Sequence, residues 1–228
     1  MKTANLLSIL LLPASLILTP VYAANEPDTY SAEAVGGTVI DQRTAKPLAG
    51  VIVVAHWQLK GGIEGGHNLG QMAVMETVTD EKGHFKFPAW GPKKRPKNAF
   101  LDYQDPQLIL FKPGYWWRGV SNEVRSKVNQ SPIRHAAWSG KTFDLKPFDG
   151  SPTDYWMNVL GSLESALSFA VVDPKDCEWK QIPKILVALE KERLAAKKQD
   201  TRVFLRPIAQ IPSTHCGSPT DFFAPYFK

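Results

Sequence analysis

Residues 51–57 read VIVVAHW, and this stretch decides the fold. Val and Ile dominate its first half, and such β-branched side chains favour extended backbone. In a strand, successive side chains point to opposite faces, so the odd-numbered residues would share one face, with Ile52 and Val54 on the other. Because both faces are apolar near the start, we expect a central strand that is covered on both sides.

Other short strands are expected on both sides of this stretch, with turn-forming residues between them. Their predicted ranges are 37–40, 72–79, 84–87, 108–111 and 142–145. Residues 80–83 place Asp first and Gly fourth, as a type I turn prefers, so 72–87 predicts a hairpin. Pro113 and Gly114 are typical of the centre of a type II turn. Short strands without helical periodicity predict a mainly β chain, with an antiparallel sandwich over residues 36–148.

The sequence after residue 149 has a helical pattern instead. Ser151 offers an N-cap hydroxyl, Pro152 suits the first helical position, and Asp154 places a carboxylate three residues after the cap. Apolar residues then follow at helical spacing: Trp156, Val159, Leu160, Leu163 and Leu167. A second helix is predicted for residues 183–198, and its apolar side carries Ile185, Leu186, Leu189 and Leu194. We therefore expect an α-helical C-terminal extension over residues 149–228.

The first residues have the pattern of a secretory signal peptide. Lys2 precedes an apolar run over residues 6–18, and small residues precede a cleavage point near Ala23. No other apolar stretch is long enough for a membrane, so we expect no transmembrane segment. The chain should be exported, periplasmic or extracellular, after residues 1–23 are removed. Residues 24–35 are polar and aperiodic, and we expect a flexible leader there.

Two cysteines, Cys177 and Cys216, are the only ones in the chain. In an exported protein two cysteines usually pair, and closing a loop of this length contributes roughly 4 kcal/mol to stability. A reactive or metal-binding cysteine pair is the alternative. It would require a reducing compartment or nearby ligands, which neither the signal peptide nor the local sequence supplies. We predict a disulfide between Cys177 and Cys216.

Four motifs occur in a fixed order along the first half of the chain. They are G-x-V-x-D at 37–41, P-L-x-G-V-x-V at 47–53, T-D-x-x-G-x-F at 79–85 and K-x-G-Y at 112–115. Together they resemble the carboxypeptidase regulatory-like domain. The resemblance covers about half of the chain and implies a transthyretin-like sandwich of seven strands. It also implies an accessory role beside a catalytic domain or on a surface protein, without catalysis.

Three segments depart from that family. They are a Gly-rich insert at 61–70, a long stretch at 91–106 and the helical extension. With no catalytic partner domain in the chain, we expect an exported bacterial binding module of the cell envelope that uses no cofactor. Its partner would be an envelope protein or a glycan, and neither the partner nor the oligomeric state can be read from the residues.

A small envelope hydrolase is the alternative class of function. The chain has no Gly-x-Ser-x-Gly motif, and Asp102 and Asp105 are expected in a polar loop with nothing to raise a pKa. A purine-pathway hydrolase shares the transthyretin-like architecture, but it ends in Tyr-Arg-Gly-Ser, whereas this chain ends in APYFK. We therefore expect no enzymatic activity.

Aromatic side chains near predicted turns form the candidate ligand site. Indole faces stack on sugar rings, and neighbouring polar groups can orient hydroxyls. The Gly-rich insert is expected to border the same end of the sandwich. The candidate residues are Trp90, Tyr115, Trp116, Trp117, Arg118, His67 and Asn68. The alternative is that Tyr115 and Trp117 only fill the sandwich core.

Neither a metal site nor a nucleic-acid interface is expected. Glu64 and His67 have a metal-ligand spacing, but that spacing needs a helix, and the surrounding glycines favour a mobile loop. The remaining histidines, at 56, 84, 135 and 215, are scattered along the chain. The formal net charge is +5, and the basic run at 93–97 is better explained as a solvated surface than as a nucleic-acid face.

Overall fold

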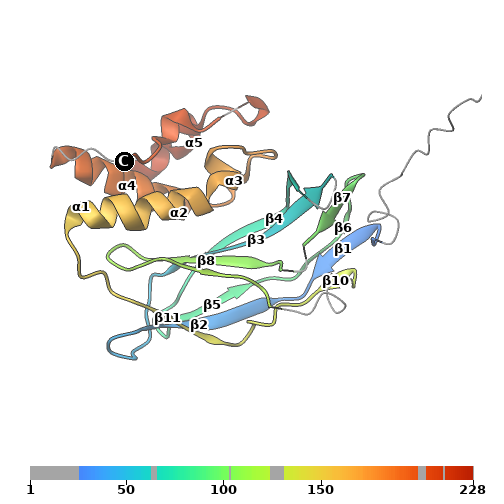
Figure 1. Ribbon diagram of the computed structural model, residues 1–228, viewed down its shortest axis with the longest axis horizontal. Helices are drawn as coiled ribbons and strands as arrows, with labels where there is room; N and C mark the ends of the chain where they lie inside the picture. The colour runs from blue at the N-terminus through green and yellow to red at the C-terminus, as the bar shows by residue number, and fades with distance from the viewer. Residues whose placement is uncertain are drawn as a thin grey trace, which may run out of the picture.

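The computed structural model describes residues 26–62, 66–102, 104–123, 131–199, 204–212 and 214–227. The predicted signal peptide lies outside these residues. The described chain is mainly β, with a C-terminal helical part, and it forms three layers. Figure 1 shows two layers of strands, with the helices lying over the outer face of one of them. No described helix has both the length and the apolar character needed to cross a membrane.

The middle layer is an antiparallel sheet with the strand order β4-β3-β8-β9. Its strands are β3 (Ile52–Gly61), β4 (His67–Val78), β8 (Gln107–Phe111) and β9 (Arg118–Val120). A short strand, β7 (Ala99–Leu101), pairs with the far end of β3. Because β3 has a hydrogen-bonded neighbour on each side, the prediction of a central strand at 51–57 is confirmed.

The outer layer consists of two three-stranded sheets. One contains β2 (Val35–Asp41), β5 (His84–Phe87) and β11 (Thr142–Leu145), and the other contains β1 (Thr29–Ala32), β6 (Trp90–Lys94) and β10 (Ile133–Arg134). The sandwich expected from the strand pattern is therefore present. Two pairings are parallel, β11 with β2 and β10 with β1, because these late strands return along long connections instead of tight turns.

The expectation of a flexible leader is wrong for its described part, which contains β1. Tyr30 is fully buried, and its hydroxyl donates a hydrogen bond to Glu26 at 2.6 Å. The guanidinium of Arg134 lies 4.8 Å from the centre of the Tyr30 ring. The contact with Arg134 joins segments about a hundred residues apart, so the polar composition of residues 24–35 could not indicate it.

The turn at residues 80–83 is present, but the hairpin predicted around it is not. The Gly83 amide donates to the Asp80 carbonyl at 2.9 Å, and Gly83 has a φ of +73°. The Asp80 carboxylate accepts hydrogen bonds from the amides of Lys82 and His84. However, β4 pairs with β3 while β5 pairs with β2. The turn therefore carries the chain from one layer of the sandwich to the other.

The Gly-rich insert also differs from the expected mobile loop. His67 and Asn68 lie in β4, where they pair with Gly61 and Lys60 of β3. The long β3–β4 ladder therefore continues into the insert. Glu64, the other half of the metal-ligand spacing, lies outside the described residues.

Local predictions for the other turn and for the helix start are confirmed. The Tyr115 amide donates to the Lys112 carbonyl at 3.1 Å across Gly114, whose φ is +82°. The Ser151 hydroxyl accepts a hydrogen bond from the Asp154 amide at 3.1 Å. Each of these hydrogen bonds joins residues that are three positions apart in the chain, which is why the sequence predicts them.

The third layer consists of helices. The α-helices are α1 (Pro152–Asp154), α2 (Gly161–Ala166), α3 (Ser168–Val171), α4 (Pro183–Lys198) and α5 (Pro219–Phe223). A π-helical turn, η3 (Tyr155–Leu160), joins α1 to α2. Short 3-10 turns occur at η4 (Glu178–Lys180), η5 (Ile208–Gln210), η6 (Thr214–Cys216) and η7 (Ala224–Phe227). The predicted disulfide between Cys177 and Cys216 is present in this layer.

Two apolar cores hold the three layers together. The odd-numbered side chains of β3, including Val53 and Trp57, lie in the core between the strand layers. Ile52 and Val54 lie in the core between the sheet and the helices. The predicted apolar stripe of the first helical segment is buried there in full, whereas Leu194 of α4 is 38% exposed. The helical extension thus shares a core with the sheet that it covers.

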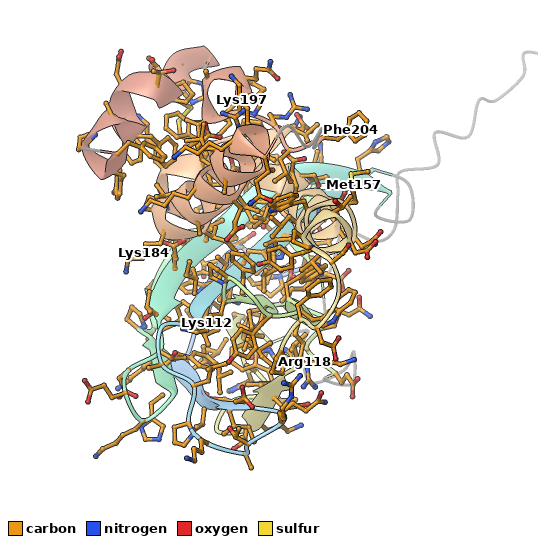
Figure 2. All side chains as sticks on the ribbon, turned by 90° about the vertical axis from the view of Figure 1, so that its left-hand side faces the viewer. Lys112, Arg118, Met157, Lys184, Lys197 and Phe204 are labelled. Carbon is orange, nitrogen blue, oxygen red and sulfur yellow. A yellow bond between two sulfur atoms is a disulfide. The ribbon has the colours of Figure 1, made fainter. Side chains whose placement is uncertain are left out.

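Glu76 of β4 fixes the start of α4. Its carboxylate accepts hydrogen bonds from the amides of Lys184 (2.9 Å) and Ile185 (2.8 Å), while the Lys184 side chain points to solvent (Figure 2). The α4 helix has no side-chain cap of its own. Burial raises the pKa of Glu76, and the two amide hydrogen bonds oppose that rise.

We expect Glu76→Gln to lower the free energy of unfolding by about 1 kcal/mol, because a neutral amide binds the positive end of a helix less strongly than a carboxylate. Urea denaturation at neutral pH measures the change. Glu81→Gln, in the exposed turn before β5, is the matched control and should leave stability unchanged. Equal effects of both substitutions would contradict the assigned role of Glu76.

Candidate functional site

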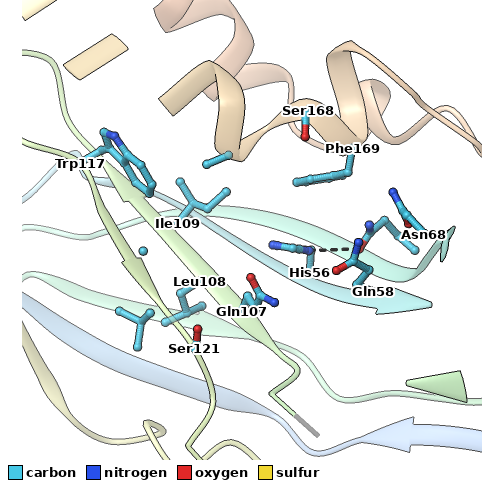
Figure 3. A pocket seen from close by; sticks show the side chains of 14 residues that line it. His56, Gln58, Asn68, Gln107, Leu108, Ile109, Trp117, Ser121, Ser168 and Phe169 are labelled. Carbon is cyan, nitrogen blue, oxygen red and sulfur yellow. Dashed lines mark hydrogen bonds between the residues drawn. The ribbon is translucent and has the colours of Figure 1, made fainter. Parts of the chain in front are cut away.

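A cavity of about 280 Å³ lies between the middle sheet and the helical layer (Figure 3). Strands β3, β4, β8 and β9 form one wall, and residues of α2 and α3 form the other. The volume is close to the lower end of the roughly 300–1,000 Å³ that is typical of small-molecule sites. This cavity is the candidate ligand site.

The alternation of β3 explains why the cavity forms at this place. His56 and Gln58 follow Ile52 and Val54 on the face of β3 that is turned toward the helices. The first half of that face is apolar and packs against the helices, and the second half is polar. The register places Gln107 of β8 opposite His56 and Gln71 of β4 opposite Gln58. Polar side chains from three neighbouring strands therefore gather at one end of the sheet.

His56 occupies the centre of this polar end. Its ring stacks on the Phe169 ring of α3, with centroids 4.6 Å apart and planes inclined by 18°. The His56 Nδ1 lies 3.1 Å from the Gln71 Oε1. Figure 3 marks this contact by the dashed line at His56. Burial lowers the pKa of His56 to about 4, although the hydrogen bond with Gln71 opposes this shift. The imidazole is therefore neutral at neutral pH.

The side-chain amide of Gln71 offers a hydrogen-bond donor, Nε2, at the cavity. Its Oε1 is engaged by His56, whereas its buried Nε2 donates to no acceptor among the described residues. Buried donors in folded proteins are rarely left without an acceptor, because desolvating one costs roughly 1–3 kcal/mol. An oxygen of a bound ligand would satisfy this amide.

Trp117 forms the opposite end of the cavity. Its indole Nε1 donates to the Ser162 hydroxyl of α2 at 2.8 Å. Gly119 leaves room for the ring, since a Cβ at this position would lie 3.2 Å from the Trp117 Cζ3. One contact from the helical layer and one from β9 thus hold the indole in place.

The structure brings two of the seven candidate residues, Trp117 and Asn68, to this cavity. Trp90 lies in the core, edge-on to Trp57 at 5.4 Å, and His67 is exposed at the start of β4. The cavity lining does not include them.

The remaining three candidates belong to the surface around β9. The Tyr115 hydroxyl donates to Asp41 at 2.9 Å, and Arg118 pairs with Asp144. Trp116 is 37% exposed and packs on Phe148 with ring centroids 5.3 Å apart. None of the three lines the cavity.

The residue patterns did not predict most of the polar lining. The polar residues that were not predicted are His56, Gln58, Gln71, Gln107, Ser121 and Ser168, and the stacking ring of Phe169 was not predicted either. A signal was available in β3, where the helix-facing residues change from Ile52 and Val54 to His56 and Gln58. An abrupt loss of hydrophobicity along one face of a central strand indicates where the covering layer leaves a gap.

Asp102 and Asp105 also differ from expectation. Asp105 is fully buried, and its pKa is raised well above the usual value, first by burial and then by the charge of Asp102. Asp102 pairs with Lys60, and the buried Arg134 opposes the shift of Asp105. The expectation that nothing raises a pKa in this loop is therefore wrong. Neither carboxylate lines the cavity, so their environment is that of a buried charge cluster in the sandwich.

Comparisons with known proteins give no family assignment. No family model and no curated protein matches the chain. Among solved structures, it is similar to 3-chlorocatechol 1,2-dioxygenase from Rhodococcus opacus, with 20% identity, a TM-score of 0.28, and coverage of 55% of this chain and 63% of that one. This chain thus spans less than two thirds of that enzyme.

Two other solved structures show likenesses of the same order. One is the dioxygenase domain of a dioxygenase–carbohydrate-binding fusion from Streptomyces sp. SirexAA-E (17% identity, TM-score 0.28, 56% of this chain and 84% of that one). The other is the C-terminal domain of the shaft pilin SpaA from Lactobacillus rhamnosus GG (13% identity, TM-score 0.24, 53% and 98%). Because these TM-scores are far below 0.5, we take neither fold nor function from them.

Proposed function

We propose that this chain is an exported, non-catalytic binding module of the cell envelope, and that its cavity binds an uncharged saccharide unit. One observation carries the proposal: the described cavity lining combines four amides and two hydroxyls with the aromatic rings of Trp117 and Phe169, and it contains no Asp, Glu, Lys or Arg. His56, the only titratable residue in the described part of the lining, is neutral at neutral pH because its pKa is lowered to about 4.

The lining chemistry suits a ligand rich in hydroxyl groups. A hydroxyl group both donates and accepts hydrogen bonds. A side-chain carboxamide can accept from it through the amide oxygen and donate to it through the NH2 group. Charged ligands are disfavoured, because a desolvated ion would meet no compensating charge. The indole of Trp117 adds a flat apolar face, on which the apolar face of a sugar ring can stack.

The same residues argue against catalysis at this site. General acid–base chemistry near neutral pH needs a group whose pKa lies close to the working pH. Among the described lining residues His56 alone titrates, and its pKa is about 4. The carboxylates with altered pKa values, such as Asp105, lie elsewhere.

We also propose that the sandwich is related to carboxypeptidase regulatory-like domains. Two of the four motifs form turns in the geometry that their residues favour, at Gly83 and Gly114. The other two supply β2 and the start of β3. The accessory role of that family agrees with a binding module. This relation rests on the motifs.

Calorimetric titration with neutral and acidic mono- and disaccharides tests the binding function. We expect millimolar or tighter binding of a neutral sugar, and Trp117→Ala should weaken it by about tenfold, since losing such a ring contact costs roughly 1 kcal/mol or more. Trp116→Ala is the matched control, because this indole lies outside the cavity. Equal losses in the two variants, or a preference for acidic sugars, would count against the proposed site.

A change at Gly119 should reduce binding without touching a polar group. Gly119→Ala places a Cβ 3.2 Å from the Trp117 ring, so we expect the indole to move and sugar affinity to fall several-fold. Gly161→Ala in α2 is the control, because an added Cβ there meets nothing within 4 Å. It should keep full affinity and gain up to about 1 kcal/mol of stability. Unchanged binding by Gly119→Ala would contradict the placement of the ligand beside Trp117.

A further inference from the structure

The disulfide in the helical layer has a histidine beside it. His215 precedes Cys216 in the chain, and its Nε2 lies 3.7 Å from the Sγ of Cys177. One ligand atom from each of Cys177, His215 and Cys216 lies within 4.8 Å of the others. His215 adjoins Cys216 in the sequence, and the fold brings its ring to Cys177 as well, so the ligand that a metal-binding cysteine pair requires is present.

The distance between His215 and Cys177 agrees with two ligands of a tetrahedral zinc site. Zn–S bonds of about 2.3 Å and Zn–N bonds of about 2.0 Å place neighbouring ligand atoms of a tetrahedron roughly 3.5–3.8 Å apart. The distance from His215 Nε2 to Cys177 Sγ is 3.7 Å. The imidazole and the Cys177 sulfur are therefore separated as two ligands of one zinc ion would be, whereas the two sulfurs, bonded in the disulfide, have to move apart to about 3.8 Å after reduction.

The site is open on one side. His215 is exposed and Cys177 is half-buried, while Cys216 is only 6% exposed. A metal ion can therefore approach from solvent, and three protein ligands would leave the fourth coordination position to water.

We propose that the reduced form of this protein binds one Zn²⁺ ion through the thiolates of Cys177 and Cys216 and the Nε2 of His215. Reduction by a dithiol breaks the Sγ–Sγ bond, and each sulfur takes one proton while the dithiol closes to its own disulfide. Zn²⁺ then displaces the two thiol protons, which pass to solvent. The disulfide and the zinc ion are alternative cross-links between the same two segments.

Packing around the cysteines keeps the ligands together when the disulfide is open. Trp179, two residues after Cys177, is fully buried. Its ring contacts Phe222 and Phe223 of α5, the helix that follows Cys216, at centroid distances of 5.3 and 5.9 Å. The two segments that carry the ligands are therefore joined by an aromatic cluster as well as by the disulfide.

Cobalt titration of the reduced protein tests the proposal. The full mature chain is reduced anaerobically with a phosphine, which becomes the phosphine oxide by taking oxygen from water, and excess reductant is removed. We expect one Co²⁺ per chain, with thiolate-to-cobalt charge-transfer absorption that Zn²⁺ abolishes by displacement. The oxidised protein should show no such absorption. His215→Gln keeps both thiols and should weaken Co²⁺ binding at least tenfold, whereas His84→Gln, at an exposed position on β5, should not change it.

Three results would overturn the proposal. The first is reduced wild-type protein that binds no more Co²⁺ than the Cys177→Ser/Cys216→Ser variant. The second is His215→Gln binding Co²⁺ as tightly as wild type, which would remove the histidine from the site. The third is loss of the folded circular dichroism spectrum on reduction without recovery on adding Zn²⁺. None of these readouts depends on sugar binding, so the saccharide proposal stands or fails separately.

Discussion

The double variant Cys177→Ser/Cys216→Ser is expected to lose about 4 kcal/mol of unfolding free energy relative to the oxidised wild type, without added metal. The disulfide closes a loop of 39 residues, and the loop-closure relation assigns about that loss to the removed constraint on the unfolded chain. Typical domains have only about 5–15 kcal/mol of stability in total. Removing this bond should therefore bring the helical layer close to its stability limit.

Urea denaturation followed by near-ultraviolet circular dichroism measures this loss. Ser165→Ala, at an exposed position in α2, is the matched control. It keeps the disulfide and leaves the capping hydroxyls of Ser151 and Ser218 in place, so it should stay within about 0.5 kcal/mol of wild type. A double serine variant as stable as wild type would show that Trp179 and α5 hold this region without the bond.

Acidification from pH 7 to pH 4 is expected to cost the wild type about 3 kcal/mol of stability through His56 alone. Burial lowers the pKa of His56 to about 4 in the folded state, against about 6.5 in the unfolded chain. Above pH 6.5 both states are neutral at this position, and its contribution to stability is complete. Between pH 6.5 and 4 the unfolded chain binds a proton that the folded protein does not, so stability falls by up to about 1.4 kcal/mol per pH unit.

The variant His56→Gln isolates this effect. Glu76, Glu164 and Glu192 also have pKa values that burial raises, so they contribute to the pH dependence of stability as well. Their contributions are present in both proteins and cancel in the difference. We expect the stability of wild type minus that of His56→Gln to fall by about 3 kcal/mol between pH 7 and pH 4. His84→Gln should show no comparable trend, and a pH-independent difference for His56→Gln would contradict its burial as a neutral group.

These two predictions concern different contacts of the helical layer. The disulfide joins the segments around η4 and η6, while the stacked rings of His56 and Phe169 lie where α3 meets β3. Protonation of His56 would place a charge at the floor of the proposed sugar cavity. Sugar binding should therefore weaken together with stability at low pH.

The sequence by itself determined the features that depend on near neighbours. The turns at Gly83 and Gly114, the Ser151 cap and the helix 183–198 were predicted because their hydrogen bonds join residues at most a few positions apart. The two-sided apolar pattern of residues 51–57 also predicted a central strand. The disulfide was predicted from two cysteines in a chain that is expected to be exported.

Only the tertiary structure decided which strands pair and what covers the sheet. The turn at residues 80–83 suits a hairpin, yet the hydrogen bonds of β5 go to β2, and burial of Tyr30 turns an expected leader into a strand. The cavity, the neutral state of His56 and the approach of His215 to Cys177 arise in the same way. Each depends on contacts between residues far apart in the chain, whose free energy is set by burial, and local sequence patterns do not encode it.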